Sequence, residues 1–109
     1  DLLAFTKRKV LGRFSPSTMY EDYAISRDLI HWQSQSTTSS TSPTGKRYQQ
    51  HATSGSSVML FARESVADRA FYFLGPATYV QHTGSEPMSI TWRLEQPLPG
   101  DLTGVLAVA

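Results

Sequence analysis

The chain of 109 residues contains no cysteine. This absence excludes a disulfide framework and any zinc site built on thiolates. No apolar run approaches the ~20 residues that a membrane-spanning helix needs, and no signal peptide is visible, so we expect no membrane partner. The formal net charge is only +1, which argues against a histone-like polycation. Any affinity for nucleic acid must therefore come from local patches or from other parts of a larger protein.

Motifs for catalysis and for metal binding are also missing. No Gly-x-Ser-x-Gly elbow is present, and no local Ser/His/Asp set is visible. Residues 42–47 resemble a phosphate-binding loop only superficially, because Ser40 stands where the leading Gly belongs and Arg47 replaces the hydroxyl residue that holds magnesium. Three histidines lack metal-ligand spacing: His31, His51 and His82. We expect a non-catalytic chain without a metal or a cofactor.

Short strands are the main structural signal. The clearest amphipathic strand places the apolar Met88, Ile90, Trp92 and Leu94 in alternation with polar residues. Trp92 and Met88 are therefore expected in the core, and residues 19–25 fit either a short strand or an irregular turn. Further strands are expected at residues 1–6, 30–34, 58–63, 71–74 and 77–81. Little helical periodicity accompanies them, so the pattern predicts one mainly β domain, a sandwich or a barrel.

Turn and cap residues divide these strands. Gly75-Pro76 predicts a bulge or a corner, because proline removes a donor from the strand ladder. Ser26 is a candidate cap for one helical turn that runs to Leu29. Pro97 and Pro99 end the last strand, and we expect a loosely structured tail after them. The chain begins at Asp1 without a methionine, so we interpret it as an excised domain.

Residues 31–48 contain many side chains that suit contacts with a polar polymer such as a nucleic acid. It holds Trp32, two glutamines, nine Ser/Thr hydroxyls, two cations and Tyr48. Hydroxyls and cations suit phosphates, amides suit base edges, and aromatic rings suit stacking. A flexible Ser/Thr linker is the alternative interpretation. Lys46 and Arg47 are expected in a turn that either contacts phosphates or forms a solvated hairpin tip.

A second group of candidates surrounds Asp22. Its carboxylate can accept a hydrogen bond from the exocyclic amine of cytosine, and the rings of Tyr20 and Tyr23 can enclose an extruded base. The alternative is a solvated acid beside core or rim tyrosines. Trp32 is either a core residue or a stacking platform. A basic cluster is either a solvated face or a phosphate contact: Lys7, Arg8, Lys9 and Arg13.

A resemblance to a known family rests on residues 31–48 and on three further segments. These are Phe14-Ser-Pro-Ser-Thr-Met-Tyr-Glu-Asp-Tyr-Ala-Ile-Ser26, Phe73-Leu-Gly-Pro-Ala-Thr-Tyr79 and Gly84-Ser-Glu-Pro-Met-Ser-Ile-Thr-Trp-Arg-Leu94. Together they resemble the C-terminal domain of bacterial proteins that combine a phospholipase-D-type nuclease with a superfamily 2 helicase. The resemblance covers roughly residues 14–100. Some of these proteins are modification-dependent (type IV) restriction enzymes, in which the C-terminal module resembles an SRA domain, the β-rich fold that flips and binds 5-methylcytosine.

The resemblance implies a cytoplasmic bacterial protein in which residues 1–109 form one DNA-binding domain. The implied fold is mainly β (α+β), a small SRA/PUA-like barrel or a strongly curved sheet with short helical turns. Implied partners are modified duplex DNA and the helicase and nuclease domains of the same polypeptide, which would carry the ATP-dependent activity. Candidates for the base pocket are Asp22, Tyr20, Tyr23 and Trp32. Candidates for backbone contacts are Gln33, Gln35, Ser36, Thr37, Thr38, Lys46 and Arg47.

Two other roles stay open. The domain can be a protein–protein coupler between helicase and nuclease, with the Ser/Thr segment as a moving connection. It can also bind unmodified or single-stranded DNA without sequence preference, by aromatic stacking.

Overall fold

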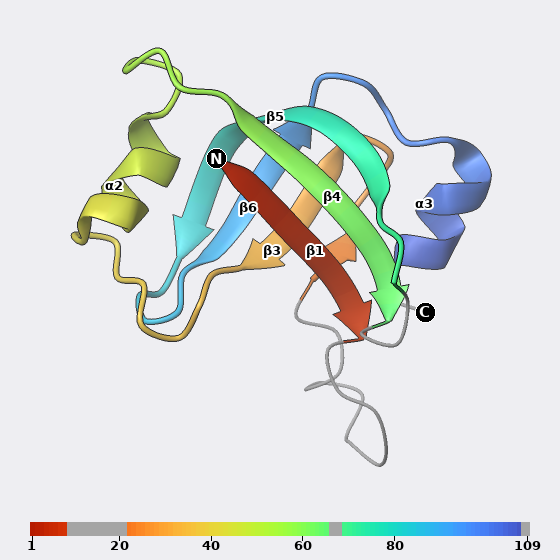
Figure 1. The fold of residues 1–109 in the computed structure, drawn as a ribbon, viewed down its shortest axis with the longest axis horizontal. Coiled ribbons are helices and arrows are strands. Elements are labelled where there is room, and N and C mark those ends of the chain that lie inside the picture. Colours follow the sequence, from red (N-terminus) through yellow and green to blue (C-terminus); the bar gives the residue numbers. More distant parts are fainter. Residues whose placement is uncertain (9–21, 66–68, 108–109) are drawn as a thin grey trace.

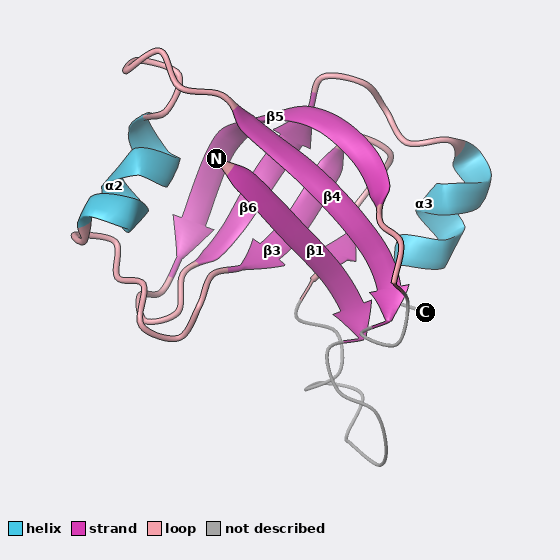
Figure 2. Cartoon of the chain, viewed as in Figure 1, coloured by secondary structure: helices cyan, strands magenta, loops and turns pink. Residues whose placement is uncertain are grey.

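A computed structural model describes residues 1–8, 22–65 and 69–107. Its strands form one six-stranded sheet in the order β1-β4-β5-β6-β3-β2, curled into a half-barrel with α2 and α3 at opposite ends (Figure 1). The strands are β1 (Leu2–Arg8), β2 (Tyr23–Ala24), β3 (Leu29–Gln33), β4 (Val58–Ser65), β5 (Tyr72–Thr83) and β6 (Ser89–Leu94), and the helices are α2 (Pro43–Gln50) and α3 (Gly100–Leu106). Figure 2 shows the predominance of strands. The expected mainly β fold with a strongly curved sheet is confirmed.

Strand pairing follows the alternation of apolar residues. β1 pairs with β4 in parallel, whereas each other neighbouring pair is antiparallel. In β6 the predicted inward residues are all buried, with Trp92 fully enclosed. The predicted bulge at Gly75-Pro76 is present, because the β4–β5 register shifts between Leu60 and Phe61 and Gly75 has a φ of +92°. β5 nevertheless runs through it as one strand.

Aromatic rings and histidine fill the core beneath α2. Trp92 contacts Trp32, Tyr48 and Tyr79 edge-on, with ring centroids 6.1 to 6.5 Å apart. His51 donates from Nδ1 to the Ser56 carbonyl at 3.2 Å and accepts from the backbone N–H of Tyr79 through Nε2 at 3.1 Å. These two bonds select the neutral tautomer with its proton on Nδ1. The core thus ties α2 to β5 and β6.

Three local expectations were wrong. Residues 43–50 are helix α2 and not a turn, because Ser42 caps the helix and Pro43 fits its first turn. Ser26 begins no helical turn; the Ile25 N–H donates to the Leu29 carbonyl at 2.8 Å and closes a tight reversal between β2 and β3. The tail contains α3, which forms because Leu102 and Leu106, four residues apart, pack on the core.

The open side of the half-barrel is joined by side chains. β1 is an edge strand, and its alternate residues turn their backbone groups away from β4. On that edge the Thr6 N–H donates to Oδ2 of Asp22 at 3.1 Å, and the Ala4 carbonyl accepts from Nε1 of Trp32 at 3.1 Å. Oδ1 of Asp22 accepts from the Gln33 N–H at 2.9 Å. Asp22 therefore links β1 to β3 where no strand ladder does.

No helix in the described part of the chain is long and apolar enough to cross a membrane. The same residues contain no group of three or more histidine and acidic side chains placed to hold a metal ion.

Candidate functional site

The Ser/Thr-rich segment is a hydrogen-bonded loop between β3 and α2. The N–H of Ser34 donates to the Met88 carbonyl at 2.9 Å, and the Met88 N–H donates back to the Ser34 hydroxyl at 2.8 Å. Further along, the Glu86 N–H donates to the Thr38 carbonyl at 2.9 Å. These bonds attach the loop to the turn before β6. The loop is therefore an ordered part of the fold and not a detached linker.

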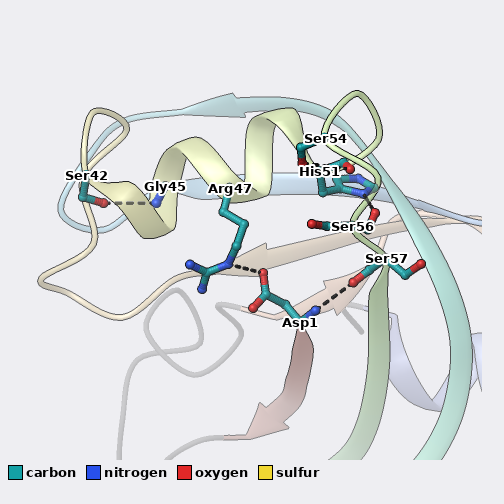
Figure 3. Close-up of polar contacts among 8 residues, drawn as sticks. All are labelled: Asp1, Ser42, Gly45, Arg47, His51, Ser54, Ser56 and Ser57. Carbon is teal, nitrogen blue, oxygen red and sulfur yellow. Dashed lines mark hydrogen bonds and ion pairs between the residues drawn. The ribbon is translucent and has the colours of Figure 1, made fainter.

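Helix α2 presses against this loop. The Ser42 hydroxyl accepts from the Gly45 N–H at 3.0 Å and caps the first turn (Figure 3). Gly45 is buried, and a Cβ built on it would lie 2.0 Å from the carbonyl oxygen of Ser39. Glycine is thus required for the helix to approach the loop this closely. Nε2 of Gln49 donates to the Ser40 carbonyl at 2.8 Å and adds a second attachment.

A cleft lies between β1, the end of β3, the loop and α2. It encloses about 580 Å³, within the range of small-molecule binding pockets. We call it the loop cleft. Its lining residues are Leu2, Leu3, Ala4, Trp32, Gln33, Ser34, Gln35, Thr37, Thr38, Ser42, Thr44 and Tyr48. The structure therefore brings together five of the residues predicted for DNA contact: Trp32, Gln33, Gln35, Thr37 and Thr38.

Amide and hydroxyl side chains line one wall of the loop cleft, and aromatic rings lie at its base. Gln35 and Thr37 are exposed, so their polar groups are accessible to a ligand, whereas Gln33 is half-buried. Trp32 and Tyr48 are only 6% and 8% exposed and meet edge-to-face at 5.5 Å. Burial raises the pKa of the Tyr48 hydroxyl, an effect that nearby Arg47 partly opposes. The phenol is consequently a neutral hydrogen-bonding group near pH 7.

The edge of β1 forms the other wall. Because Thr6 and Ala4 turn backbone groups toward this side, the alternation of the strand places those of Leu2 there as well. The loop cleft thus combines side-chain amides and hydroxyls with strand-edge backbone groups. Such a set can form directional hydrogen bonds with a flat polar ring.

The two predicted cations lie on the exposed side of α2. Nε of Arg47 donates to Oδ2 of Asp1 at 2.7 Å, with the Arg47 side chain still 45% exposed (Figure 3). Lys46 is exposed, and neither cation lines the loop cleft. Ser36 is exposed on the loop and also lies outside the lining. These three side chains therefore lie outside the lining of the loop cleft.

The structure describes three of the four candidates for the base pocket: Asp22, Tyr23 and Trp32. Asp22 has 0% exposure, and each carboxylate oxygen accepts a backbone N–H. Tyr23 stacks on His31 with ring centroids 4.6 Å apart and an interplanar angle of 15°. Tyr20 lies outside the described residues, as do Lys9 and Arg13. Among the three described candidates, Trp32 alone lines the loop cleft.

Comparison with known families matches residues 3–106 to the model described as "Domain of unknown function (DUF3427)". The chain belongs to this family. No curated protein matches the chain. The match includes every residue of the loop cleft except Leu2, so the cleft is part of the DUF3427 domain itself.

Several lining residues of this DUF3427 domain were not predicted from the sequence. Leu3 and Ala4 enter the loop cleft only because the sheet curls β1 toward β3, and no local pattern encodes that approach. Ser42 and Thr44 enter with the first turn of α2. A serine directly before a proline is a helix-start signal, and it would have identified this helix and its position beside the segment.

Proposed function

We propose that this domain is a DNA-binding target-recognition module that reads a modified base, 5-methylcytosine, after the base has flipped out of the duplex. The observation that carries the proposal is the loop cleft, which places amides, hydroxyls and aromatic rings around about 580 Å³ of accessible space. The similarity to the C-terminal domain of type IV restriction helicase–nucleases, SRA-like in those proteins, supports the same role. In this proposal the domain binds DNA, and the other domains of the polypeptide perform the ATP-dependent and nuclease steps.

Base reading is assigned to the polar wall. Gln33 and Gln35 carry both donors and acceptors, which match the mixed pattern on a cytosine edge. Thr37 adds a hydroxyl that can donate or accept. Trp32 and Tyr48 supply an apolar base against which the flipped ring packs. Extrusion costs a few kcal/mol, which these contacts offset.

Duplex attachment is assigned to the border of the cleft. Lys46 and Arg47 are exposed cations on one helix, and Ser36 adds a hydroxyl on the adjoining loop. Cations and hydroxyls hold phosphates without reading sequence. This division separates affinity from selectivity, so salt should weaken binding to modified and unmodified duplexes alike.

Selectivity requires more than contact with the methyl group. Burying one methyl group contributes only about 0.8 kcal/mol, roughly a fourfold preference. Hydrogen bonds at the base edge contribute about 1 to 3 kcal/mol for each good bidentate pair. Pocket fit and polar recognition must therefore act together, and the glutamines of the loop cleft are the side chains on which recognition rests.

A second candidate is a coupler that joins helicase and nuclease domains. Exposed apolar side chains favour it, because Leu2, Tyr72 and Phe73 are 75%, 57% and 63% exposed. Large apolar side chains that remain exposed are common at protein contacts.

Titration of the domain with matched duplexes tests the proposal. Methylated and unmethylated cytosine duplexes of the same sequence would be compared by fluorescence anisotropy at several salt concentrations. The expected result is tighter binding of the methylated duplex and a similar salt slope for both. Equal affinities with a steep salt slope would refute modified-base reading in favour of non-specific binding. Absence of binding to either duplex would favour the coupler.

A matched pair of glutamine variants locates the reading surface. Gln35→Ala removes an exposed amide from the loop cleft, and Gln81→Ala removes an exposed amide from β5 outside it. We expect Gln35→Ala to reduce the methylated-to-unmethylated preference by about fivefold or more, and Gln81→Ala to leave it unchanged. An equal effect of the two substitutions would exclude the loop cleft as the reading site.

A further inference from the structure

The outer face of the half-barrel carries a group of phenylalanine rings that the proposed function does not use. Phe61 on β4 and Phe73 on β5 are register partners, and their ring centroids lie 5.0 Å apart. Phe71 lies just before β5 and is 39% exposed, while Phe73 is 63% exposed. Large aromatic rings exposed side by side on a sheet are uncommon in a monomeric protein. We call these three residues the phenylalanine platform.

A shallow apolar hollow connects the platform to β1. It encloses about 230 Å³ and is lined by Leu2, Leu3, Ala4, Phe61 and Phe71. That volume is below the range typical of pockets for drug-sized ligands, roughly 300 to 1,000 Å³, so it suits one flat ring. The first three lining residues also line the loop cleft, so the two sites adjoin across the same edge strand.

Positive charge gathers at one end of the platform. The guanidinium of Arg63 lies 4.5 Å from the ring centroid of Phe71, a cation–π distance, and Arg69 is exposed two residues before that ring. Among the residues whose side chains the structure describes, Arg63 and Arg69 therefore supply two positive charges at this end of the sheet, and Glu64 supplies one negative charge.

We propose that the phenylalanine platform is a second nucleic-acid surface, which binds single-stranded nucleic acid by stacking bases on Phe61, Phe71 and Phe73. Charge complementarity selects this occupant, because the guanidinium groups of Arg63 and Arg69 lie beside the platform and suit a polyanion. Aromatic side chains on a sheet face are an established way to bind unpaired bases. A duplex cannot use the platform in the same way, because its base faces are already stacked on one another.

The platform and the loop cleft have separate tasks in this proposal. The cleft accepts one base through hydrogen bonds, whereas the platform accepts successive bases without reading their edges. The proposal does not depend on modified-base reading, since the platform residues Phe61 and Phe73 line no part of the cleft.

The test measures binding of the domain to fluorescein-labelled oligothymidine by anisotropy, with a blunt duplex of equal length as the comparison. We expect Phe73→Ala to weaken oligothymidine binding about tenfold and to change duplex binding less than twofold. Phe73→Trp should restore binding because a larger ring keeps the stacking surface. Val80→Ala, which shortens another exposed side chain of β5, should have no effect.

Two arginine variants test the contribution of charge, and a variant of the loop cleft serves as a further control. Arg69→Gln should weaken oligothymidine binding and lower its salt slope by about one, whereas Arg93→Gln, on β6, should not. Gln35→Ala should leave oligothymidine binding intact even where it alters duplex preference. Undetectable oligothymidine binding, or binding insensitive to both Phe73→Ala and Arg69→Gln, would overturn the proposal. Concentration-dependent self-association that Phe73→Ala abolishes, with DNA binding unchanged, would overturn it in favour of a protein interface.

Discussion

Asp22→Ala removes the carboxylate that links β1 to β3 across the open side of the half-barrel. The backbone N–H groups of Thr6 and Gln33, which donate to it at 3.1 and 2.9 Å, would lose a charged acceptor. Hydrogen bonds to charged groups contribute about 1.5 to 3 kcal/mol each. Two of them predict a loss of roughly 3 to 6 kcal/mol in the free energy of unfolding. That is a large fraction of the stability of a domain of this size.

Thermal and urea unfolding would measure this loss. At roughly 4 °C or more per kcal/mol, the Tm of Asp22→Ala should fall by at least about 12 °C. The Tm of Asp22→Asn should fall about half as far. Its amide oxygen still accepts from one backbone N–H, whereas its NH₂ group is a donor and cannot accept from the other. Asp28→Ala is the matched control, since it removes an exposed carboxylate that pairs with Arg93 at 3.1 Å and should cost less than about 1 kcal/mol.

The result separates two roles for the same carboxylate. A structural link predicts a large loss of stability in Asp22→Ala. A base-reading carboxylate predicts a nearly unchanged Tm together with a lost preference for methylated DNA. A Tm within about 2 °C of the parent would refute the structural interpretation.

Three further predictions concern α2 and its surroundings. Gly45→Ala should lower the Tm by several degrees despite the better helix propensity of alanine, because its Cβ would lie 2.0 Å from the Ser39 carbonyl oxygen; no loss would contradict that close approach. His51→Phe should cost about 1 to 3 kcal/mol in urea unfolding, because the buried N–H of Tyr79 loses its acceptor. Burial raises the pKa of Tyr48, so the unfolded chain releases this proton first. Stability should therefore fall as the pH rises above about 10, and Tyr48→Phe should flatten that decline.

Local patterns in the sequence predicted most of the sheet. The alternation of apolar residues from Met88 to Leu94 predicted which side chains of β6 are buried, and the Gly75-Pro76 pair predicted the bulge in β5. These features depend on near neighbours, and near neighbours are visible in a sequence. Helix α3 was not predicted, because two prolines indicated that regular structure ends after the last strand. The spacing of Leu102 and Leu106 nevertheless fits one face of a helix.

The candidate site was predicted in composition but not in geometry. The sequence identified Gln33, Gln35 and Thr37 as polar contacts, and the structure places all three in one cleft. It did not indicate that β1 forms the opposite wall, because that wall comes from the curvature of the whole sheet. The hydrogen bonds of Asp22 could not be predicted from local sequence either, because the N–H groups that it binds lie 16 and 11 residues away in the chain.

Base extrusion is the event on which the proposed function depends most directly, and 2-aminopurine fluorescence reports it. The probe would be placed beside the modified cytosine, where stacking quenches it until the neighbouring base leaves the helix. Addition of the domain should increase fluorescence with the methylated duplex, less with the unmethylated one, and much less for Gln35→Ala. Saturated binding of the methylated duplex with no increase in fluorescence would contradict base flipping into the loop cleft.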